Sequence, residues 1–384
     1  MWYNVDMKKH AIIPIFIPHR GCGHSCVFCN QRAITARQPD VSPEEVRGIL
    51  DQWLSTMQRL DGPGSNGLET IEAAFYGGSF TGLPLSEQAA FLAVTKEYKD
   101  RGLIDRIHLS TRPDYIDDQI LSQLADYSVD IIELGVQSFD PEVLERSRRG
   151  HTVQDIYAAC DLIRSYGFTL GIQLMIGLPG DSPEKCIDSA RQTVSIGPSL
   201  ARLYPTVVLR DTELARMYAE GEYRPLTTEE AVAITKEMYR ILDDAGITIL
   251  RVGLKSTDLI SDSSESSAVE GFSFHPAIRQ LVEGEIAKED LEAQLIPMLR
   301  EHEPGQFPSL AGEHGSTHRF VFSCCGESFS NMIGHKACNK KYFTGKFPHA
   351  SFIFAVDDAL PRGTYLVKKQ DCDHSHSPSL IHSL

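Results

Sequence analysis

The sequence predicts an α/β fold in which six parallel strands, each followed by a helix, form a partial TIM-like (β/α)6 barrel. Two observations predict it. Apolar runs alternate with helical stretches over the first two thirds of the chain, and such alternation produces right-handed βαβ units and a parallel sheet. Each glycine-rich or polar motif directly follows one of these runs. Six units are too few for a closed eight-stranded barrel, so we expect the barrel to be open.

The predicted strands are short apolar runs that end at Gly, Pro or a polar cluster. They cover residues 11–17, 71–76, 104–110, 130–137, 169–176 and 203–209. Capping signals predict where the helices between them begin. Ser42-Pro43-Glu44-Glu45 is a capping box with proline at the first helical position, and it predicts a helix reaching about residue 60. Ser182-Pro183-Glu184 and Thr227 open later helices in the same way.

Composition and charge restrict the class of protein. The 384 residues are 42% hydrophobic with a net charge of -15, as in a globular protein that is not a general nucleic-acid binder, although a local basic face can still contact RNA. Nine cysteines are too few for a disulfide framework in a chain this long, and three of them lie in one loop, which indicates a reducing compartment. The run at 11–17 is too short for a signal peptide or a membrane span. We expect a cytoplasmic protein.

The chain divides into four predicted parts. Residues 1–253 form the barrel domain, and 254–270 are a Ser/Asp/Glu-rich linker. Residues 271–370 are expected to form a small C-terminal α+β module, with a helix up to Leu299 and a strand at 319–322. The Ser/His-rich stretch 371–384 is expected to be a disordered tail.

The loop after the first strand carries three cysteines, Cys22, Cys26 and Cys29. Thiolates suit iron–sulfur clusters and zinc. An ordinary [4Fe-4S] site uses four cysteines, so three would leave one iron open to a small molecule. The alternative is a zinc site, which usually needs four ligands and for which His19 and His24 are close in sequence.

Two further motifs follow the second and third strands. Gly77-Gly78-Ser79 lets a ligand approach the backbone without an intervening side chain, or it is only a tight turn. Arg112 has a guanidinium fork that matches a carboxylate. The alternative for Arg112 is an ion pair with Asp114 that braces the turn.

Polar residues also end the later strands. Glu133 and Gln137 are four residues apart in one strand, so both side chains face the same side of the sheet. Polar groups buried in the barrel interior need hydrogen-bonding partners, which favours a polar ligand at this position. Arg149 comes next in the sequence. It is predicted either to supply a positive charge for a ligand carboxylate or to be a solvated surface residue. Gly177 and Leu178, in Gly-Leu-Pro-Gly, form a rigid apolar turn suited to packing against an adenine ring.

These motifs, in this order, resemble the radical S-adenosylmethionine (SAM) superfamily. The spacing C-x3-C-x2-C, with Phe28 before the last cysteine, is similar to its cluster loop. The likeness covers roughly residues 12–253 and is greatest to the radical domain of the elongator catalytic subunit, a tRNA-wobble-uridine enzyme. Oxygen-independent coproporphyrinogen oxidase is a more distant relative. The segments that carry the likeness to elongator are 112–116, 133–138, 149–152 and 203–206.

The resemblance implies a [4Fe-4S] cluster on the three cysteines, with SAM chelating the fourth iron. A flavodoxin- or ferredoxin-type donor would supply an electron, and cleavage of SAM would give a 5′-deoxyadenosyl radical. The cofactor contacts that it implies are Phe28, Gly77, Gly78, Ser79, Arg112, Gln137, Arg149, Gly177 and Leu178. It assigns no catalytic residue. Ser79 stands where the family has an acid, the gap between the first two cysteines is shorter than in elongator, and we find no acetyltransferase domain, so acetyl transfer is not implied.

The C-terminal module contains Gly334-His335-Lys336-Ala337, which resembles the glycine loop of KH domains, with Ala337 in place of the second glycine. With Lys340, Lys341 and Lys346 it is a candidate RNA-facing patch, and the alternative is a solvated charged helix. Three functions follow: a radical SAM enzyme acting on RNA, a non-catalytic Fe–S scaffold that binds RNA, or a radical SAM enzyme for a small molecule such as a tetrapyrrole.

Overall fold

The computed structural model describes residues 10–17, 20–23, 25–30, 41–57, 67–256, 260, 268–270, 274–300 and 318–370. It divides into two compact units, Met1–Ile278 and Arg279–Leu384, which are described separately. The predicted tail at 371–384, much of the predicted linker at 254–270, and both His19 and His24 lie outside the described residues.

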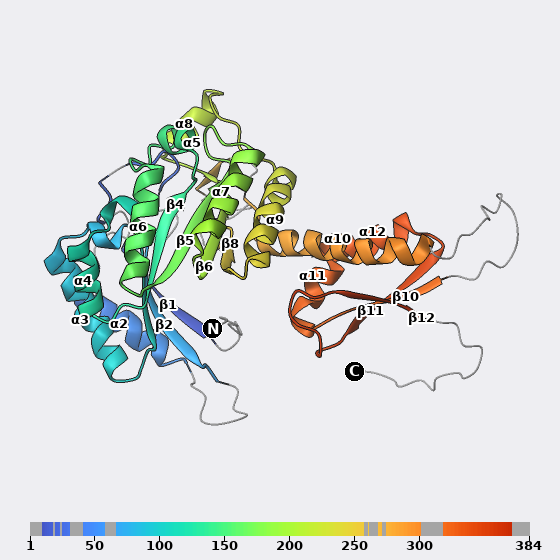
Figure 1. The fold of residues 1–384 in the computed structure, drawn as a ribbon, viewed down its shortest axis with the longest axis horizontal. Helices are drawn as coiled ribbons and strands as arrows, with labels where there is room; N and C mark the ends of the chain where they lie inside the picture. The colour runs from blue at the N-terminus through green and yellow to red at the C-terminus, as the bar shows by residue number, and fades with distance from the viewer. Residues whose placement is uncertain are drawn as a thin grey trace, which may run out of the picture. The chain divides into compact units, whose positions relative to one another are not determined.

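The first unit contains a sheet of seven parallel strands in the order β1-β2-β3-β4-β5-β6-β8 (Figure 1). The strands are β1 (His10–Phe16), β2 (Thr70–Tyr76), β3 (Arg106–Thr111), β4 (Ile131–Gln137), β5 (Thr169–Ile176), β6 (Leu200–Pro205) and β8 (Thr248–Val252). This confirms the predicted open, parallel, barrel-like α/β fold. The helices of this unit flank the sheet in Figure 1.

The predicted number of six strands is wrong. The seventh strand, β8, directly follows a long helix and mixes Thr248 and Arg251 with apolar residues, so its short sequence does not stand out as a buried run. The predicted strand at 203–209 is also divided in two. Its second part is β7 (Val208–Leu209), which pairs antiparallel with β9 (Val269–Glu270) outside the main sheet.

Three helices of the first unit begin at the predicted caps Ser42, Ser182 and Thr227. Ser42 forms a capping box with Glu45 at the start of α2, although α2 ends at Leu54 rather than near residue 60. Thr227 and Glu230 form another. The helices are α2 (Pro43–Leu54), α3 (Leu85–Asp100), α4 (Asp118–Asp126), α5 (Pro141–Arg146), α6 (Val153–Ser165), α7 (Pro183–Ile196), α8 (Glu213–Ala219) and α9 (Thr228–Asp244), with 3-10 turns η1 (Phe80–Gly82) and η2 (Pro113–Tyr115).

The second unit is an α+β module with a three-stranded sheet in the order β11-β10-β12. Its elements are α10 (Ile278–Arg300), β10 (His318–Cys324), η3 (Gly326–Ser328), α11 (Phe329–Ile333), η4 (His335–Ala337), α12 (Cys338–Lys346), β11 (Ala350–Val356) and β12 (Leu366–Gln370). Phe320, Phe322 and Phe343 are fully buried in its core. Among the described residues, no helix combines the length and the apolar character needed to cross a membrane.

Candidate functional site

The cysteine loop, residues 20–30, follows β1 and is held against the end of β2 by close backbone contacts. A Cβ atom on Gly21 would lie 2.0 Å from the carbonyl oxygen of Ser79, and one on Gly78 would lie 2.4 Å from that of Arg20. Gly21 also has a φ of +72°, which favours glycine. Gly21 and Gly78 therefore have a structural task, which is to let the cysteine loop approach the end of β2.

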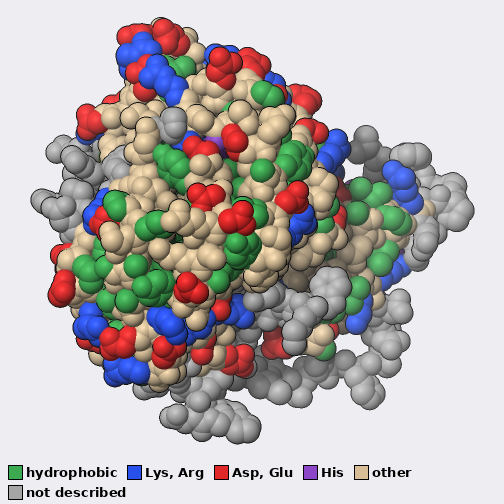
Figure 2. Space-filling model, turned by 60° about the vertical axis from the view of Figure 1, so that its left-hand side comes forward, with side chains coloured by type: hydrophobic (Ala, Val, Ile, Leu, Met, Phe, Trp, Pro, Cys, Tyr) green, Lys and Arg blue, Asp and Glu red, His purple; other side chains and the backbone are tan. Residues whose placement is uncertain are grey.

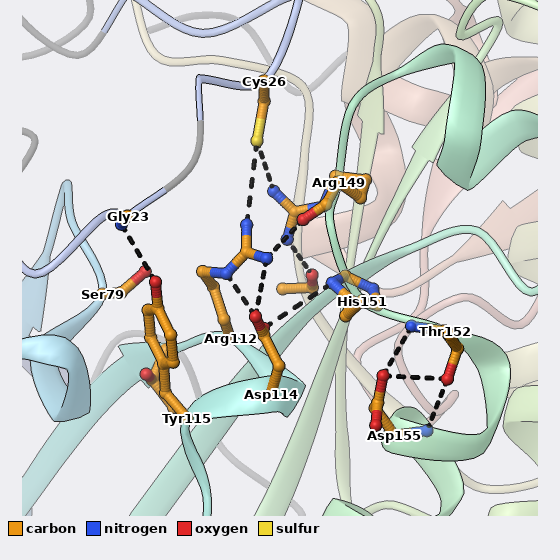
Figure 3. Close-up of polar contacts among 12 residues, drawn as sticks. Gly23, Cys26, Ser79, Arg112, Asp114, Tyr115, Arg149, His151, Thr152 and Asp155 are labelled. Atoms are coloured by element: carbon orange, nitrogen blue, oxygen red, sulfur yellow. Dashed lines mark hydrogen bonds and ion pairs between the residues drawn. The ribbon is translucent and has the colours of Figure 1, made fainter.

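Three other segments hold the cysteine loop through hydrogen bonds. The Gly23 N–H donates to the Tyr115 hydroxyl at 2.9 Å (Figure 3). The Val27 N–H donates to the Ser147 carbonyl at 3.2 Å, and the Val27 carbonyl accepts from Leu214 at 2.8 Å. The sequence did not indicate a role for Tyr115, although this residue belongs to one of the segments that carry the family likeness.

The three cysteines are not in disulfides, and their surroundings differ. Cys22 is exposed, with its Sγ 3.3 Å from the Ser79 hydroxyl. The Sγ of Cys26 accepts from Arg149 Nη1 at 3.0 Å and lies 4.0 Å from Arg112 Nη1, while Cys29 is half-buried. In the part of the chain that the structure describes, no three Cys, His, Asp or Glu side chains are gathered closely enough to hold a metal ion.

The chemistry of the donor set nevertheless fits an iron–sulfur cluster. Three cysteine thiols lie on one loop at the carboxyl edge of a parallel sheet, and thiolates are the usual ligands of such clusters. The buried Nε of Arg149, beside Cys26, has no hydrogen-bond acceptor among the described residues. The zinc alternative depends on His19 and His24, outside those residues.

The two arginines of the candidate site are both buried. Arg112 pairs with Asp114 through Nε and Nη2, at 2.9 Å each, and its Nη2 also donates to the Arg149 carbonyl, so the turn-bracing ion pair is present. Arg149 is only 5% exposed, and the surface alternative for it is wrong. Its guanidinium donates to the Gly135 carbonyl and lies 6.0 Å from the centre of the Phe28 ring.

Gln137 ends β4 with a left-handed backbone. Its φ is +71°, which is uncommon for a residue other than glycine and typical of functional sites. The strand register shifts between Leu134 and Gln137, and the Gln137 Oε1 accepts from Gln173 Nε2 at 3.1 Å. Gln173 was missed, although a polar residue inside an apolar strand is the same signal that singled out Glu133.

Glu133 has its partner inside the protein. Its carboxylate accepts from Arg202 Nε at 2.6 Å, and both side chains are buried. The expectation that a ligand satisfies Glu133 is therefore wrong, because Arg202 on β6 was not considered as a partner.

Gly177 and Leu178 follow β5, and Gly177 borders a separate cavity. This cavity of about 520 Å³ lies between α7 and α9, with Asp181, Cys186 and Leu226 among its lining residues. The Gly177 N–H donates to Asp181 at 2.9 Å, and its carbonyl accepts from Tyr223 at 2.6 Å. Burial raises the pKa of Asp181. Leu178 is itself buried.

His151 predicts a specific pH dependence of stability. Burial, together with the positive charges of Arg149 and Arg112, lowers the pKa of His151 to about 3 from 6.5. Below pH 6.5 His151 becomes protonated in the unfolded chain but stays neutral in the folded chain down to about pH 3. The free energy of unfolding therefore falls as the pH decreases through this range. Between pH 7.5 and pH 5 this contribution is about 2 kcal/mol.

We therefore expect the metal-free wild type to lose about 2 kcal/mol more than His151→Gln when urea unfolding at pH 5 is compared with pH 7.5. Each protein is its own control at pH 7.5, where His151 is neutral in both states. Equal losses in both proteins would show that His151 does not stay neutral in the folded chain.

Comparisons with known proteins agree with this fold. Residues 16–193 match the family model of the Radical SAM superfamily, and residues 198–288 match that of the Radical SAM C-terminal domain. A tRNA uridine(34) acetyltransferase of Methanocaldococcus jannaschii is 27% identical over 65% of this chain and 54% of its own length. Human Elongator complex protein 3 is 24% identical over 62% of this chain and 51% of its own length.

The archaeal Elp3 of Methanocaldococcus infernus, solved with its N-terminus deleted, has a similar fold. The TM-score is 0.55 at 21% identity, covering 73% of this chain and 63% of that one. The chain spans about half the length of the curated relatives named above. The two family models together cover most of the chain and include the cysteine loop and the carboxyl ends of all seven strands. The chain therefore belongs to the radical SAM superfamily and is a radical SAM enzyme.

Proposed function

We propose that this protein holds a [4Fe-4S] cluster on Cys22, Cys26 and Cys29, binds SAM and uses it to modify RNA. The observation that carries the proposal is the cysteine loop itself, which supplies three cysteine thiols at the carboxyl edge of the parallel sheet. Chemistry in parallel barrels collects at this edge.

A cluster held by Cys22, Cys26 and Cys29 would supply one-electron reduction of SAM, with electrons from a flavodoxin- or ferredoxin-type donor, and thereby the radical chemistry that removes a hydrogen atom from a substrate. The chain's own residues bind and orient. Gly77, Gly78 and Ser79 offer backbone groups beside the cysteine loop, and Phe28 offers an apolar ring next to Arg149.

The test is anaerobic reconstitution of the full chain with iron and sulfide, followed by dithionite and SAM. We expect 5′-deoxyadenosine, detected by liquid chromatography. An intact cluster without 5′-deoxyadenosine would instead support the non-catalytic Fe–S scaffold.

Gln137 is proposed to bind SAM through its side-chain amide. Its strained backbone holds the amide at the end of β4, and loss of a hydrogen bond to a charged ligand costs enough to weaken binding about tenfold. We expect Gln137→Ala to weaken SAM binding by about this factor while the iron content stays at the wild-type level. Gln173→Ala, which removes the partner of Gln137, is the matched control for indirect effects. An unchanged affinity in Gln137→Ala would refute the assignment.

An RNA substrate is supported by the relatives, two of which are tRNA uridine(34) acetyltransferases from Methanocaldococcus species. The second unit offers a lysine patch, Lys336, Lys340 and Lys341, whose side chains are exposed. Lys346, also predicted to belong to it, is paired with Glu292 at 2.5 Å. On the face that Figure 2 shows, Lys and Arg side chains lie among Asp and Glu, so the net charge of -15 does not form a continuous acidic surface there.

The backbone beside the lysine patch supports the KH-like comparison. Gly334 has a φ of +79°, and Ala337, which replaces the second glycine, has a left-handed φ of +60°. A residue other than glycine rarely takes this conformation, so the turn follows a path that glycine would allow.

We expect neutralisation of the lysine patch (Lys336→Gln, Lys340→Gln and Lys341→Gln together) to remove crosslinked RNA, because phosphate contacts dominate affinity. The measurement is ultraviolet crosslinking to tRNA. The control is Lys368→Gln with Arg362→Gln, at exposed positions on and near β12 of the same unit. Crosslinking that survives in the triple variant would favour a small-molecule substrate such as a tetrapyrrole.

We also propose that the enzyme works in a reducing, cytoplasmic compartment. None of the eight cysteines in the described part of the chain is in a disulfide, and thiols persist where glutathione and thioredoxin keep them reduced.

A further inference from the structure

Two buried arginines face the sulfur of Cys26. Arg149 Nη1 lies 3.0 Å from the Sγ atom and Arg112 Nη1 lies 4.0 Å from it. Figure 3 shows both guanidinium groups directed at this sulfur from below, one from the loop after β3 and one from the segment between α5 and α6. Arg112 is 4% exposed and Arg149 is 5% exposed, so water screens neither charge effectively.

The two arginines differ in how their charges are balanced. The fork of Arg112 is occupied by Asp114, which accepts at 2.9 Å from both Nε and Nη2. Arg149 forms no ion pair with a carboxylate of the described residues, and it donates to the Gly135 carbonyl and to Cys26. Its buried Nε has no acceptor in that part of the chain. A buried cation without an anion is costly, so Arg149 needs a negative partner on the side of Cys26.

We propose that Arg149 is a positioning residue for the iron–sulfur cluster, orienting Cys26 through an N–H···S hydrogen bond and stabilising the reduced cluster with its positive charge. This inference rests on the proposed function, because it requires a cluster on the cysteine loop. Outer hydrogen-bond partners orient metal ligands, and hydrogen bonds to sulfur and net charge set the potentials of Fe–S clusters. Reduction adds a negative charge, so a nearby cation favours it and raises the potential.

The proposal changes the role that the family resemblance implies for Arg149. Two of the five guanidinium N–H groups of Arg149 already donate within the protein, through Nη1 to Cys26 and through Nη2 to the Gly135 carbonyl. These two hydrogen bonds direct the guanidinium at the cysteine loop, so the proposal assigns Arg149 to the cluster rather than to the carboxylate of SAM.

The test compares Arg149→Gln, Arg149→Lys and Arg148→Gln in the reconstituted full chain. Arg148 is the matched control because it is the adjacent arginine, but its side chain is 62% exposed and pairs with Glu213 at 3.1 Å. The midpoint potential is measured by redox titration followed by electron paramagnetic resonance. We expect Arg149→Gln to lower the equilibrium constant of one-electron reduction at least tenfold, equal to about 59 mV. Arg149→Lys should retain part of this constant, and Arg148→Gln should match the wild type.

An unchanged potential in Arg149→Gln, or an equal shift in Arg148→Gln, overturns the proposal. Weaker SAM binding at an unchanged potential also overturns it and restores the carboxylate role. If Arg149→Gln folds, as judged by circular dichroism, but holds no cluster, the iron content of Arg149→Lys decides: retained iron supports the positioning role, and lost iron contradicts the role of the charge. A wild type that assembles no cluster refutes the proposed function itself and is detected before any variant is measured.

Discussion

Alanine in place of Cys22, Cys26 or Cys29 is expected to abolish the brown absorption of the reconstituted cluster and the formation of 5′-deoxyadenosine. The effect is expected to be complete because the three thiolates ligate only three of the four irons of a [4Fe-4S] cluster. Loss of one more protein ligand would leave two irons without a cysteine. The measurements are the visible spectrum, the iron and sulfide content, and the 5′-deoxyadenosine released after reduction in the presence of SAM.

Cys338→Ala is the matched control for the three cysteine variants. Cys338 is an exposed free thiol in the second unit, so it tests whether loss of any accessible cysteine reduces cluster assembly. We expect it to retain the wild-type iron content. A cysteine-loop variant that keeps its full iron content would contradict the assignment, as would spectroscopy showing four protein ligands or zinc in the wild type.

The fold was predictable to the extent that local signals decide it. Capping residues such as Ser42 and Thr227 act within one turn of a helix, and the structure has both capping boxes. The strand β8 was not predictable in the same way, because its residues Thr248–Val252 become a strand by pairing with β6, far away in the sequence. Sheet membership of a short mixed segment depends on this tertiary pairing more than on its own composition.

The sequence was enough to predict where in the fold the candidate site lies, but only part of the contacts between its side chains. Placing each motif at a strand end was enough to bring the cysteine loop to Gly78 and Arg112. Which polar side chains pair with each other could not be read from spacing, since Glu133 on β4 pairs with Arg202 on β6, across the intervening strand β5. The side-chain direction of Arg149 likewise depends on a loop conformation that no short motif specifies.

Glu133 and Arg202 belong to a buried polar network inside the first unit. Arg202 Nε donates to Glu133 at 2.6 Å, and its Nη2 donates to the Tyr76 hydroxyl at 2.6 Å. His108 Nδ1 lies 2.6 Å from Glu72, which is also buried. Burial opposes ionisation of Glu72, but His108 and His10 outweigh it and hold the pKa of Glu72 well below its usual range. The network therefore keeps charged groups where water cannot stabilise them.

Arg202→Met is expected to destabilise the metal-free protein by about 3–5 kcal/mol, because it leaves the Glu133 carboxylate buried without a cation. The measurement is the free energy of urea unfolding, followed by circular dichroism. Arg224→Met is the matched control. Arg224 pairs with Glu230 at 2.9 Å, but its side chain is 69% exposed, and exposed ion pairs contribute little to stability. We expect no measurable loss in that variant.

The double variant Arg202→Met with Glu133→Leu separates the pair's attraction from the cost of an orphaned charge. If the large loss in Arg202→Met comes from the unpaired carboxylate, removing that carboxylate should restore much of the stability, since apolar residues can replace a buried ion pair at little cost. The double-mutant cycle measures this coupling directly. The contrary outcome is a double variant whose loss of unfolding free energy equals the sum of the losses in the two single variants. In that case each side chain would contribute independently, through Tyr76 and His108, and the Glu133 carboxylate would be satisfied without Arg202.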